Sequence, residues 1–426
     1  MLECTLCVTS RHVAIEQLWS KIHMRRMPYF YDKNAAAPKG GDMDKTDLSV
    51  VRRPIERANG LPNAHYINHA VFEEERAALL VKGWAGLAVA ADVPEPGDAL
   101  PVQFLGMPLL MVRDTSGTVR VFQNTCRHRG MILVDAPRNI EGAIRCPYHS
   151  WCYATDGRLV ATPHVGGPGQ NTADGIDRSL LGLVQVKSHI WMDVVWINIS
   201  GDAPKFEIAN AELLDRWAEF DKPLYHGGAD SRFQLEVACN WKLAVENYCE
   251  SYHLPWIHPG LNSYSRLEDH YHIEAPERFS GQGTWVYRQL KDEAGQRFPD
   301  FEGLSDKWDT AAEYISAYPN VLLGVHRDHT FAIILMPQGP GKTVENVHLY
   351  YAMPDTDPAL RTRNTEQWKD VFKEDIFVVE GMQRGRHAPL FDGGRFSPAM
   401  DGPTHLFHDW VASRLAQHRA SASAAQ

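Results

Sequence analysis

Two short loops, each carrying one cysteine and one histidine, constrain this chain more than any other feature. The segment NTCRHRGMILVDAPRNIEGAIRCPYHSWCY contains Cys126-x-His128, seventeen further residues, and then Cys146-x₂-His149. A cysteine and a histidine this close together fit on one tight loop, and two such loops can close on one metal centre. The spacing favours a shared metal centre over four unrelated residues.

The order of the four ligands bears on the kind of centre. Structural zinc sites of this composition pair cysteine with cysteine and histidine with histidine. In a [2Fe–2S] centre of the Rieske type the thiolates bind one iron and the imidazoles the other, so each loop must carry both ligand types. A rigid turn, hydroxyl groups near sulfur and an aromatic shield are offered by Pro147, Tyr148, Ser150 and Trp151. The pattern favours the Rieske-type centre.

The remaining cysteines are not expected to form a second centre. The chain has seven cysteines, and an odd count in a large chain of this character argues against a disulfide framework. Cys4 and Cys7 form a CxxC pair without a second pair, and a four-ligand site needs partners that this pair lacks. Cys152, Cys239 and Cys249 are interpreted as small packing residues.

Changes in composition along the chain indicate its organisation. A small, polar stretch, AAAPKGGDMDKTD, ends the first segment, and Met43 within it is an alternative start. Short β-branched and aromatic runs separated by turn signals follow, and a long helix is predicted from Thr365 to Arg386. We expect five segments: a flexible extension at 1–45, a helical segment at 46–83 packing on the second domain, an all-β domain at 84–200, an α+β domain at 201–418, and a flexible tail at 419–426.

Charge and hydropathy exclude several classes of partner. The net charge of −10 argues against nucleic acid, because phosphate binding requires a basic surface. No run of 18 apolar residues predicts a membrane span, and no signal peptide is recognised, so a cytoplasmic protein is expected. No glycine-rich nucleotide loop is found, and NAD(P)H and flavin would therefore belong to a partner.

A second group of metal-type residues lies in NWKLAVENYCESYHLPWIHPG. Glu246, Glu250 and His253 are spaced i, i+4 and i+7, so they share one face if the helix is continuous. Pro255 disfavours helix at the preceding residue, and the predicted kink brings His258 back toward His253. Two imidazoles and one carboxylate on one side of an iron form the facial triad of non-haem iron oxygenases.

The carboxylate of this triad is expected on the long helix. Asp375 falls on the apolar stripe of that helix, whereas Glu374 is turned aside. A carboxylate that faces a core is costly unless it is paired or bound to a metal. A salt bridge or a cap is the alternative for Asp375, and core packing is the alternative for the histidines. The presence of both constellations in one chain favours iron, with Asp375 as the third ligand.

On these residues the chain resembles the alpha subunits of Rieske non-haem iron ring-hydroxylating oxygenases, over roughly Trp84 to Asp409. The cluster motif C-x-H…C-x₂-H of that family matches at Cys126, His128, Cys146 and His149. Its motif E-N-x-x-(D/E)-x-Y-H-x₄-H matches at Glu246, Asn247, Glu250, Tyr252, His253 and His258. Its late aspartate ligand, followed by a glutamate in a helix, matches Asp375 before Glu380.

The resemblance implies a fold, an assembly and a set of cofactors. The fold would be α+β, with an all-β Rieske [2Fe–2S] domain and a catalytic domain of the helix-grip type, in which an antiparallel sheet wraps around a long helix. The oxygenase would hold a [2Fe–2S] cluster and a mononuclear Fe(II), and it would form a homotrimer served by an NAD(P)H-dependent reductase. Glu250 would bridge His149 of one subunit and His253 of its neighbour, and Asn247 and Tyr252 would be further catalytic positions.

The glutamate at the bridge bears on the substrate. Ring dioxygenases usually have aspartate there, and glutamate is similar to the branch that acts on quaternary ammonium compounds such as carnitine, glycine betaine or stachydrine. The expected reaction is monooxygenation with N-demethylation or C–N cleavage, and oxygen insertion at an N-methyl group would release formaldehyde. An aromatic cage for the cation would draw no more than about two residues from Trp256, Tyr264, Trp285, Tyr287 and Tyr318.

Other functions stay open at this point. One is hydroxylation or dihydroxylation of an aromatic acid or ring. Another is a Rieske electron carrier with a non-catalytic binding domain, and a third is a zinc-stabilised interaction protein. The sequence leaves open whether a beta subunit joins the assembly.

Overall fold

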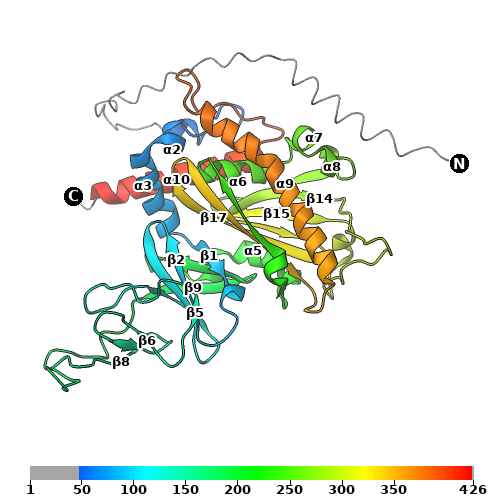
Figure 1. Ribbon diagram of the computed structural model, residues 1–426. Coiled ribbons are helices and arrows are strands. Elements are labelled where there is room, and N and C mark those ends of the chain that lie inside the picture. The colour runs from blue at the N-terminus through cyan, green and yellow to red at the C-terminus, as the bar shows by residue number, and fades with distance from the viewer. Residues whose placement is uncertain (1–47, 425–426) are drawn as a thin grey trace, which may run out of the picture. The chain divides into compact units, whose positions relative to one another are not determined.

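The computed structural model describes residues 48–424. The predictions for Cys4, Cys7, Met43 and the N-terminal extension lie outside these residues. The described strands form three antiparallel sheets, and the long helices pack on the largest of them (Figure 1). No helix in this part of the chain is both long and apolar enough to cross a membrane.

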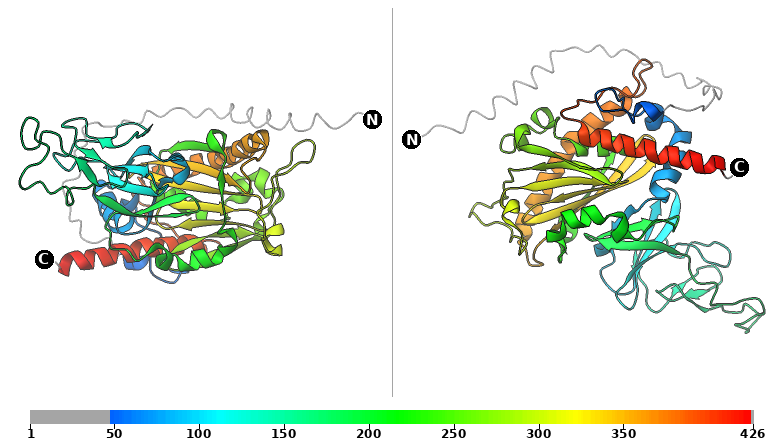
Figure 2. Two further views of the ribbon diagram at one scale, coloured as in Figure 1. Left: turned by 90° about the horizontal axis from the view of Figure 1, so that it is seen from below. Right: turned by 180° about the vertical axis from the view of Figure 1, so that it is seen from behind.

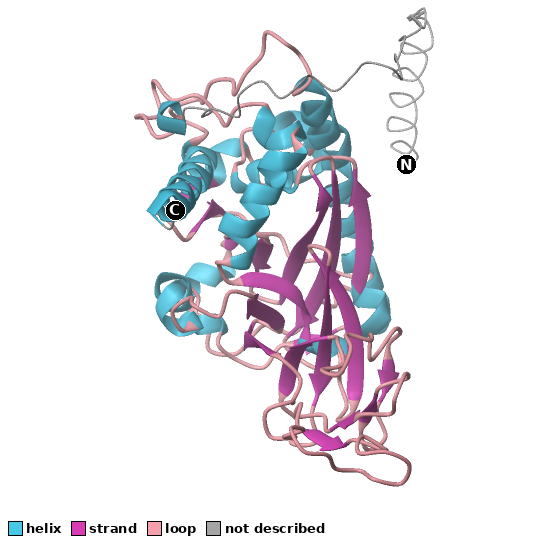
Figure 3. Ribbon diagram, turned by 90° about the vertical axis from the view of Figure 1, so that its left-hand side faces the viewer, coloured by secondary structure: helices cyan, strands magenta, loops and turns pink. Residues whose placement is uncertain are grey.

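The β-rich part contains a seven-stranded and a three-stranded sheet. The larger sheet has the order β1-β10-β9-β4-β3-β2-β5. Its strands are β1 (Ala85–Val89), β2 (Asp98–Phe104), β3 (Met107–Arg113), β4 (Val119–Gln123), β5 (Arg138–Asn139), β9 (Gln185–Trp191) and β10 (Val194–Asn198). The small sheet consists of β6 (Ile144–Arg145), β7 (Cys152–Tyr153) and β8 (Leu159–Ala161). Figure 3 shows that loops predominate around this small sheet.

The second domain is built on an eight-stranded sheet with the order β11-β18-β17-β16-β15-β14-β13, in which β12 also pairs with β18. The strands are β11 (Tyr225–His226), β12 (Arg232–Val237), β13 (His270–Ala275), β14 (Phe279–Thr284), β15 (Ala312–Ala317), β16 (Val321–Val325), β17 (His329–Gly339) and β18 (Lys342–Tyr351). This antiparallel sheet with long helices on it confirms the predicted α+β fold class.

Strand β17 explains how one sheet supports two cores. Side chains alternate between the faces of a strand. Phe331, Ile333 and Leu335 belong to the core beneath the helices. Ala332, Ile334 and Met336 belong to the core shared with the seven-stranded sheet. A continuous apolar run therefore forms the strand, because both faces are buried.

Three helices pack on the large sheet or on one another: α6 (Trp241–Cys249), α9 (Pro358–Gly385) and α10 (Gly402–Ala424). Figure 2 shows α10, in red, lying beside the part of the sheet that contains β13 and β14, both of which it contacts. The shorter helices are α2 (Ala64–Ile67), α3 (His69–Glu75), α4 (Phe206–Ala209), α5 (Ala211–Arg216), α7 (Leu254–Ile257) and α8 (Pro259–Asn262), and a wider helical turn at Arg76–Val81 continues α3.

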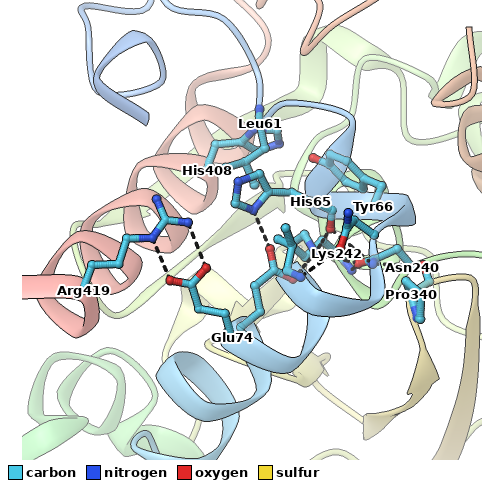
Figure 4. Close-up of polar contacts among 12 residues, drawn as sticks. Leu61, His65, Tyr66, Glu74, Asn240, Lys242, Pro340, His408 and Arg419 are labelled. Atoms are coloured by element: carbon cyan, nitrogen blue, oxygen red, sulfur yellow. Dashed lines mark hydrogen bonds and ion pairs between the residues drawn. The ribbon is translucent and has the colours of Figure 1, made fainter. Parts of the chain in front are cut away.

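Two predicted boundaries require correction. The long helix α9 begins at Pro358 rather than Thr365, because Asp357 caps it by accepting from the Ala359 amide at 2.9 Å and proline suits the first turn. The prediction of a flexible tail from residue 419 was wrong as far as Ala424, since α10 continues to that residue. Arg419 donates twice to Glu74, at 2.7 and 2.9 Å, and ties this end of α10 to α3 (Figure 4).

A buried ion pair connects α6 to the helical segment that precedes β1 (Figure 4). Lys242 Nζ lies 2.6 Å from Glu75 Oε2, and both side chains are fully buried. The ammonium group also donates to the His65 carbonyl at 2.6 Å and to Asn240 Oδ1 at 2.9 Å. The lysine therefore holds the start of α6, the helix that leads into the second group of metal-type residues.

We expect Lys242→Met to lower the free energy of unfolding by about 3–5 kcal/mol, because it leaves the Glu75 carboxylate buried without its cation. Lys342→Met is the matched control: Lys342 pairs with Glu236 at 2.8 Å with both side chains exposed, and its loss should cost about 0–1 kcal/mol. Urea denaturation of both variants measures the difference. Equal midpoints would contradict a structural role for the buried pair.

Candidate active site

The two Cys/His loops have the same backbone construction. In the first, the Cys126 amide donates to the Met131 carbonyl at 2.8 Å, and the Gly130 amide donates back to Cys126 at 2.9 Å. In the second, the Cys146 amide donates to Trp151 at 2.8 Å, and the Ser150 amide donates back to Cys146 at 3.0 Å. The residue four places after each cysteine has a positive φ, 71° at Gly130 and 58° at Ser150. Each loop is thus a tight turn closed on its cysteine.

These turns place like ligands side by side. Cys126 and Cys146 are buried, and burial is the main cause that raises the pKa of the Cys126 thiol, with a further contribution from Cys146. His128 and His149 are exposed, with ring centroids 4.8 Å apart. The Tyr153 hydroxyl lies 3.2 Å from Cys126 Sγ, and Trp151 stacks on His128 at 4.9 Å. The cysteines come together inside the fold and the histidines at its surface.

The arrangement fits a two-iron cluster better than a single zinc ion. A tetrahedral zinc site brings all four ligand atoms around one point. Within residues 48–424, one set of three such atoms lies within 4.8 Å of one another, and it is not drawn from these four residues. Two buried thiols and two exposed imidazoles match a [2Fe–2S] cluster with a different ligand type on each iron.

The set that does converge is His253, His258 and Asp375. His253 precedes the short helix α7 and His258 follows it, so one helical turn separates the two rings, whose centroids are 5.1 Å apart. Asp375 Oδ1, from α9, lies 3.1 Å from His258 Nε2 and 3.7 Å from His253 Nε2. The structure therefore brings together the three residues predicted to hold iron.

The local path of the chain differs from the prediction. Helix α6 ends at Cys249, and Glu250 is extended, with φ of −125° and ψ of 161°. The predicted helical face shared by Glu246, Glu250 and His253 was therefore wrong. Glu246 instead lies in a separate buried network with Tyr66 and His408, where it accepts from the Tyr66 hydroxyl at 2.6 Å.

Carboxylates hold the far side of both imidazoles. Glu250 Oε1 lies 2.6 Å from His253 Nδ1, and Glu374 Oε2 lies 2.7 Å from His258 Nδ1. A carboxylate on Nδ1 fixes the tautomer that leaves Nε2 free for a metal. Asn247 donates to Asp375 Oδ1 at 3.3 Å. Although burial lowers the pKa of His258, Asp375 and Glu374 outweigh it and raise that pKa, so the site attracts positive charge.

Glu374 was predicted to be turned aside from the apolar stripe of α9. Its side chain leaves the stripe, as expected, and is 47% exposed, but its carboxylate also contacts His258 Nδ1 at 2.7 Å. Sequence periodicity places a side chain on a face of a helix, but it does not reveal which loop residue that face meets.

We expect Glu374→Ala to weaken Fe(II) binding by about 10- to 100-fold, because His258 loses the carboxylate that orients its ring. Asp370→Ala is the control that should keep wild-type affinity, because Asp370 lies one turn earlier on α9, is exposed, and pairs with Lys373 at 3.8 Å. Equilibrium titration of iron-depleted protein gives both constants. Unchanged affinity in Glu374→Ala would show that the contact is incidental.

Comparisons with known proteins agree with both centres. Residues 83–176 match the Rieske [2Fe-2S] domain, and residues 215–417 match the ring hydroxylating alpha subunit (catalytic domain). The chain belongs to the Rieske oxygenase family. The cofactors of this oxygenase are accordingly a [2Fe–2S] cluster and a mononuclear non-haem iron.

Relatives of the oxygenase include enzymes named for quaternary ammonium substrates. It is 26% identical over 368 residues to the chloroplastic choline monooxygenase of Arabidopsis thaliana, which covers 83% of this chain and 82% of the relative. It is 26% identical over 328 residues to the carnitine monooxygenase oxygenase subunit of Escherichia coli K12, and this alignment covers 76% of this chain and 83% of the relative.

Among solved structures, the quaternary ammonium Rieske monooxygenase CntA in complex with L-carnitine aligns with a TM-score of 0.70 at 22% identity, covering 88% of this chain and 99% of that one. Naphthalene 1,2-dioxygenase from Rhodococcus aligns with a TM-score of 0.68 at 17% identity, and the alignment covers 86% of this chain and 98% of the dioxygenase chain. At these identities the alignments establish the fold.

A cavity opens beside the three metal-type residues of the oxygenase. It is lined by His253, His258 and Asp375 and by a wall rich in rings: Tyr248, Tyr264, Tyr287, Tyr314, Phe331, Trp368 and Phe372. Of the five aromatic residues proposed for the substrate, Tyr264 and Tyr287 line this cavity. Five ring residues were missed because they lie on elements whose inward faces look like ordinary core.

The other three aromatic candidates lie elsewhere. Trp256 is 69% exposed and Trp285 is 54% exposed, stacked on Tyr271 at 4.4 Å. Tyr318 is buried, and its hydroxyl donates to Ser280 Oγ at 2.8 Å. These three side chains therefore do not line this cavity. Tyr252 is also outside the lining, half-exposed, with its amide bonded to Glu250 Oε2.

A polar network behind the ring wall was also missed. Asp328 is fully buried, and His329, Tyr287 and Trp368 are connected to it directly or through one another. The run HRDH inside an otherwise apolar stretch, VLLGVHRDHTFAIIL, was the available signal. Charged residues at a buried turn between two apolar strands require partners, and they could have been singled out on that ground.

Proposed function

We propose that this chain is the terminal oxygenase component that inserts oxygen from O₂ into a quaternary ammonium compound. The observation that carries the proposal is the ring-lined cavity beside His253, His258 and Asp375. A methylated cation binds well over aromatic faces and needs few hydrogen bonds. The names of the choline and carnitine monooxygenases among the relatives support the same substrate class.

In this proposal Cys126, His128, Cys146 and His149 hold the cluster, and His253, His258 and Asp375 hold the iron. When bound, the cluster supplies electrons and the iron activates O₂. Asn247 steadies Asp375, while Glu250 and Glu374 orient the two imidazoles. The ring wall excludes water and holds the substrate beside the triad.

Glu250 has a further role across a subunit boundary. His149 is exposed on the Rieske domain, and the Glu250 carboxylate lies at His253 with 14% of its side chain exposed. In a homotrimer, His149 of one chain would donate to Glu250 of the next, and this carboxylate would then contact one histidine of each centre. Heterologous contacts that close after three copies generate such a ring. Tyr252 and Trp256, half-exposed or exposed beside Glu250, would pack at this boundary.

The proposed reaction requires two electrons and two protons for each O₂, supplied by NAD(P)H through a partner reductase. One oxygen atom enters an N-methyl C–H bond and the other leaves as water. The resulting N–CH₂OH group gives up its hydroxyl proton to solvent and loses formaldehyde, and the substrate nitrogen keeps the electron pair of the broken C–N bond. We also propose a cytoplasmic location, as expected from the sequence.

The test is a substrate screen of the purified oxygenase with a reductase and NADH. Choline, carnitine and glycine betaine are compared with benzoate and salicylate, with oxygen uptake and formaldehyde as readouts. We expect at least one quaternary amine to give formaldehyde in proportion to oxygen consumed. Turnover of the aromatic acids alone would replace the proposal with ring hydroxylation.

A further inference from the structure

A buried carboxylate that forms no ion pair at or below 4.0 Å with a lysine or arginine of the described residues lies behind the ring wall of the cavity. Asp328 is 0% exposed. Its carboxylate accepts from the Tyr287 hydroxyl at 2.8 Å and from Gln289 Nε2 at 3.2 Å, and its third partner is His329 Nδ1 at 2.9 Å. Tyr287 and His329 both line the cavity, so the charge lies one residue behind the surface that a substrate would touch.

The hydrogen bonds fix the protonation of this network. Trp368 Nε1 donates to His329 Nε2 at 2.9 Å, and an indole N–H can only donate. His329 Nε2 must therefore accept, which places the ring proton on Nδ1, facing Asp328. His329 is thus neutral, and Asp328 is the acceptor of three donors. The network carries a net charge of about −1, because an acceptor of three donors is an ionised carboxylate.

Neighbouring groups do not neutralise that charge. Arg327 interacts electrostatically with Asp328, but its ion pairs are with Asp300 at 2.6 Å and Asp309 at 3.1 Å, so two other carboxylates already match its charge. His326 stacks on His329 at 4.2 Å, and burial, followed by the neighbouring His329, lowers its pKa well below the usual value, which keeps it neutral. Burying an unpaired carboxylate is expensive, and its cost is offset if a cation binds in front of it.

The outer end of the same cavity carries the opposite charge. Arg288 lines both the cavity and the vestibule outside it, and its guanidinium lies 5.9 Å from the centre of the Tyr264 ring. Among the residues that line the cavity itself, Arg288 is the one lysine or arginine. Within the described part of the chain, it makes no ion pair with a carboxylate at or below 4.0 Å. Guanidinium groups bind carboxylates in a fork geometry.

We propose that the substrate is a zwitterion, a methylated ammonium carboxylate, whose cation binds against the wall backed by Asp328 and whose carboxylate pairs with Arg288. The inference rests on the proposed function and narrows it, because it selects betaines over amino alcohols such as choline. Asp328 acts through Tyr287 and His329 and is a positioning residue. Arg288 contacts the substrate directly.

Four ligands that differ in the charges they carry test the two charged ends of the cavity separately in the wild-type protein. Glycine betaine carries both charges, choline only the cation, 3,3-dimethylbutanoate only the carboxylate, and 3,3-dimethyl-1-butanol neither. Binding to the metal-loaded wild-type protein is measured by calorimetry, with carnitine as a longer zwitterion. We expect glycine betaine or carnitine to bind at least about tenfold more tightly than either singly charged ligand. Choline binding as tightly as both zwitterions would overturn the proposal.

Two variants then assign each charge to its residue. Asp328→Asn should weaken the binding of glycine betaine and of choline by about tenfold and leave the affinity for 3,3-dimethylbutanoate unchanged. Arg288→Gln should weaken the binding of glycine betaine and of 3,3-dimethylbutanoate and leave the affinity for choline unchanged. Asp370→Asn and Lys291→Gln, which alter charges that line the vestibule but not the cavity, are the controls. Equal losses for all four ligands in Asp328→Asn would overturn its assignment and show a purely structural role.

The outcome is distinguishable from failure of the proposed function. If quaternary amines release formaldehyde but these charge substitutions do not discriminate the ligands, only the present inference fails. If no ammonium compound binds or reacts while an aromatic acid does, the proposed function fails as well. Should Asp328→Asn not fold, the wild-type comparison and Arg288→Gln still decide the proposal.

Discussion

Asp375→Ala is expected to lower the iron content from three atoms per chain to two, the two of the [2Fe–2S] cluster, and to abolish oxygen insertion. Asp375 supplies the only carboxylate of the three convergent ligand atoms, at 3.1 Å from His258 Nε2 and 3.7 Å from His253 Nε2. Two imidazoles alone leave the site without its charged ligand. The visible absorption of the cluster should be unchanged, because its ligands lie in the other domain.

Metal analysis, absorption spectra and product formation measure this outcome. Asp370→Ala, on the same helix and exposed, should keep three irons and full turnover. Retention of three irons in Asp375→Ala would mean that the third ligand lies elsewhere. Loss of the cluster together with the mononuclear iron would mean that the substitution disturbs the fold.

Glu250→Gln is expected to keep both metal centres and to reduce coupled turnover by about 100-fold, in the range seen when a partner of a metal ligand is lost. The amide can still accept from His253 Nδ1, whose distance to Glu250 Oε1 is 2.6 Å in the native protein. It carries no negative charge, however, and it offers only one acceptor for the two histidines that the carboxylate would join. Iron binding should therefore survive while electron delivery between chains does not.

The control for this variant is Glu268→Gln, an exposed carboxylate in the segment that follows α8. Both variants are assayed for iron, for the rate of cluster reduction by the reductase, and for formaldehyde. We expect the cluster of Glu250→Gln to be reduced at the wild-type rate, and electron transfer from the cluster to the iron to be slow. Near-normal turnover would show that the Glu250 carboxylate does not carry electrons between the two centres.

The sequence was most informative where ligand type and spacing act within one loop. Cys126, His128, Cys146 and His149 lie on two turns with matching hydrogen bonds, and the mixed order of ligands was enough to favour the cluster over zinc. The inward position of Asp375 also followed from a local rule, because helical period needs no knowledge of neighbours. The kink predicted at Pro255 was wrong: Leu254 and Pro255 form the first turn of α7, and the chain leaves the preceding helix at Glu250 instead.

Prediction failed where a side chain's environment depends on distant elements. The end of α6 at Cys249 separates Glu250 from the helix, and no strong stop signal marks that point. Glu374 meets His258 only because α9 crosses the α7 segment. The ring wall is assembled from strands and a helix far apart in the chain, so Tyr314 and Trp368 could not be told from core residues.

Mixed oligomers test most directly whether the two metal centres cooperate between chains. His128→Ala, which disables the cluster, and Asp375→Ala, which disables the iron, are co-expressed with different affinity tags, and oligomers containing both are purified in tandem. Each mixed cyclic trimer has one junction in which an intact cluster faces an intact iron site, so about one third of wild-type turnover is expected. Mixed trimers as inactive as either parent, although both chains are present, would contradict the account.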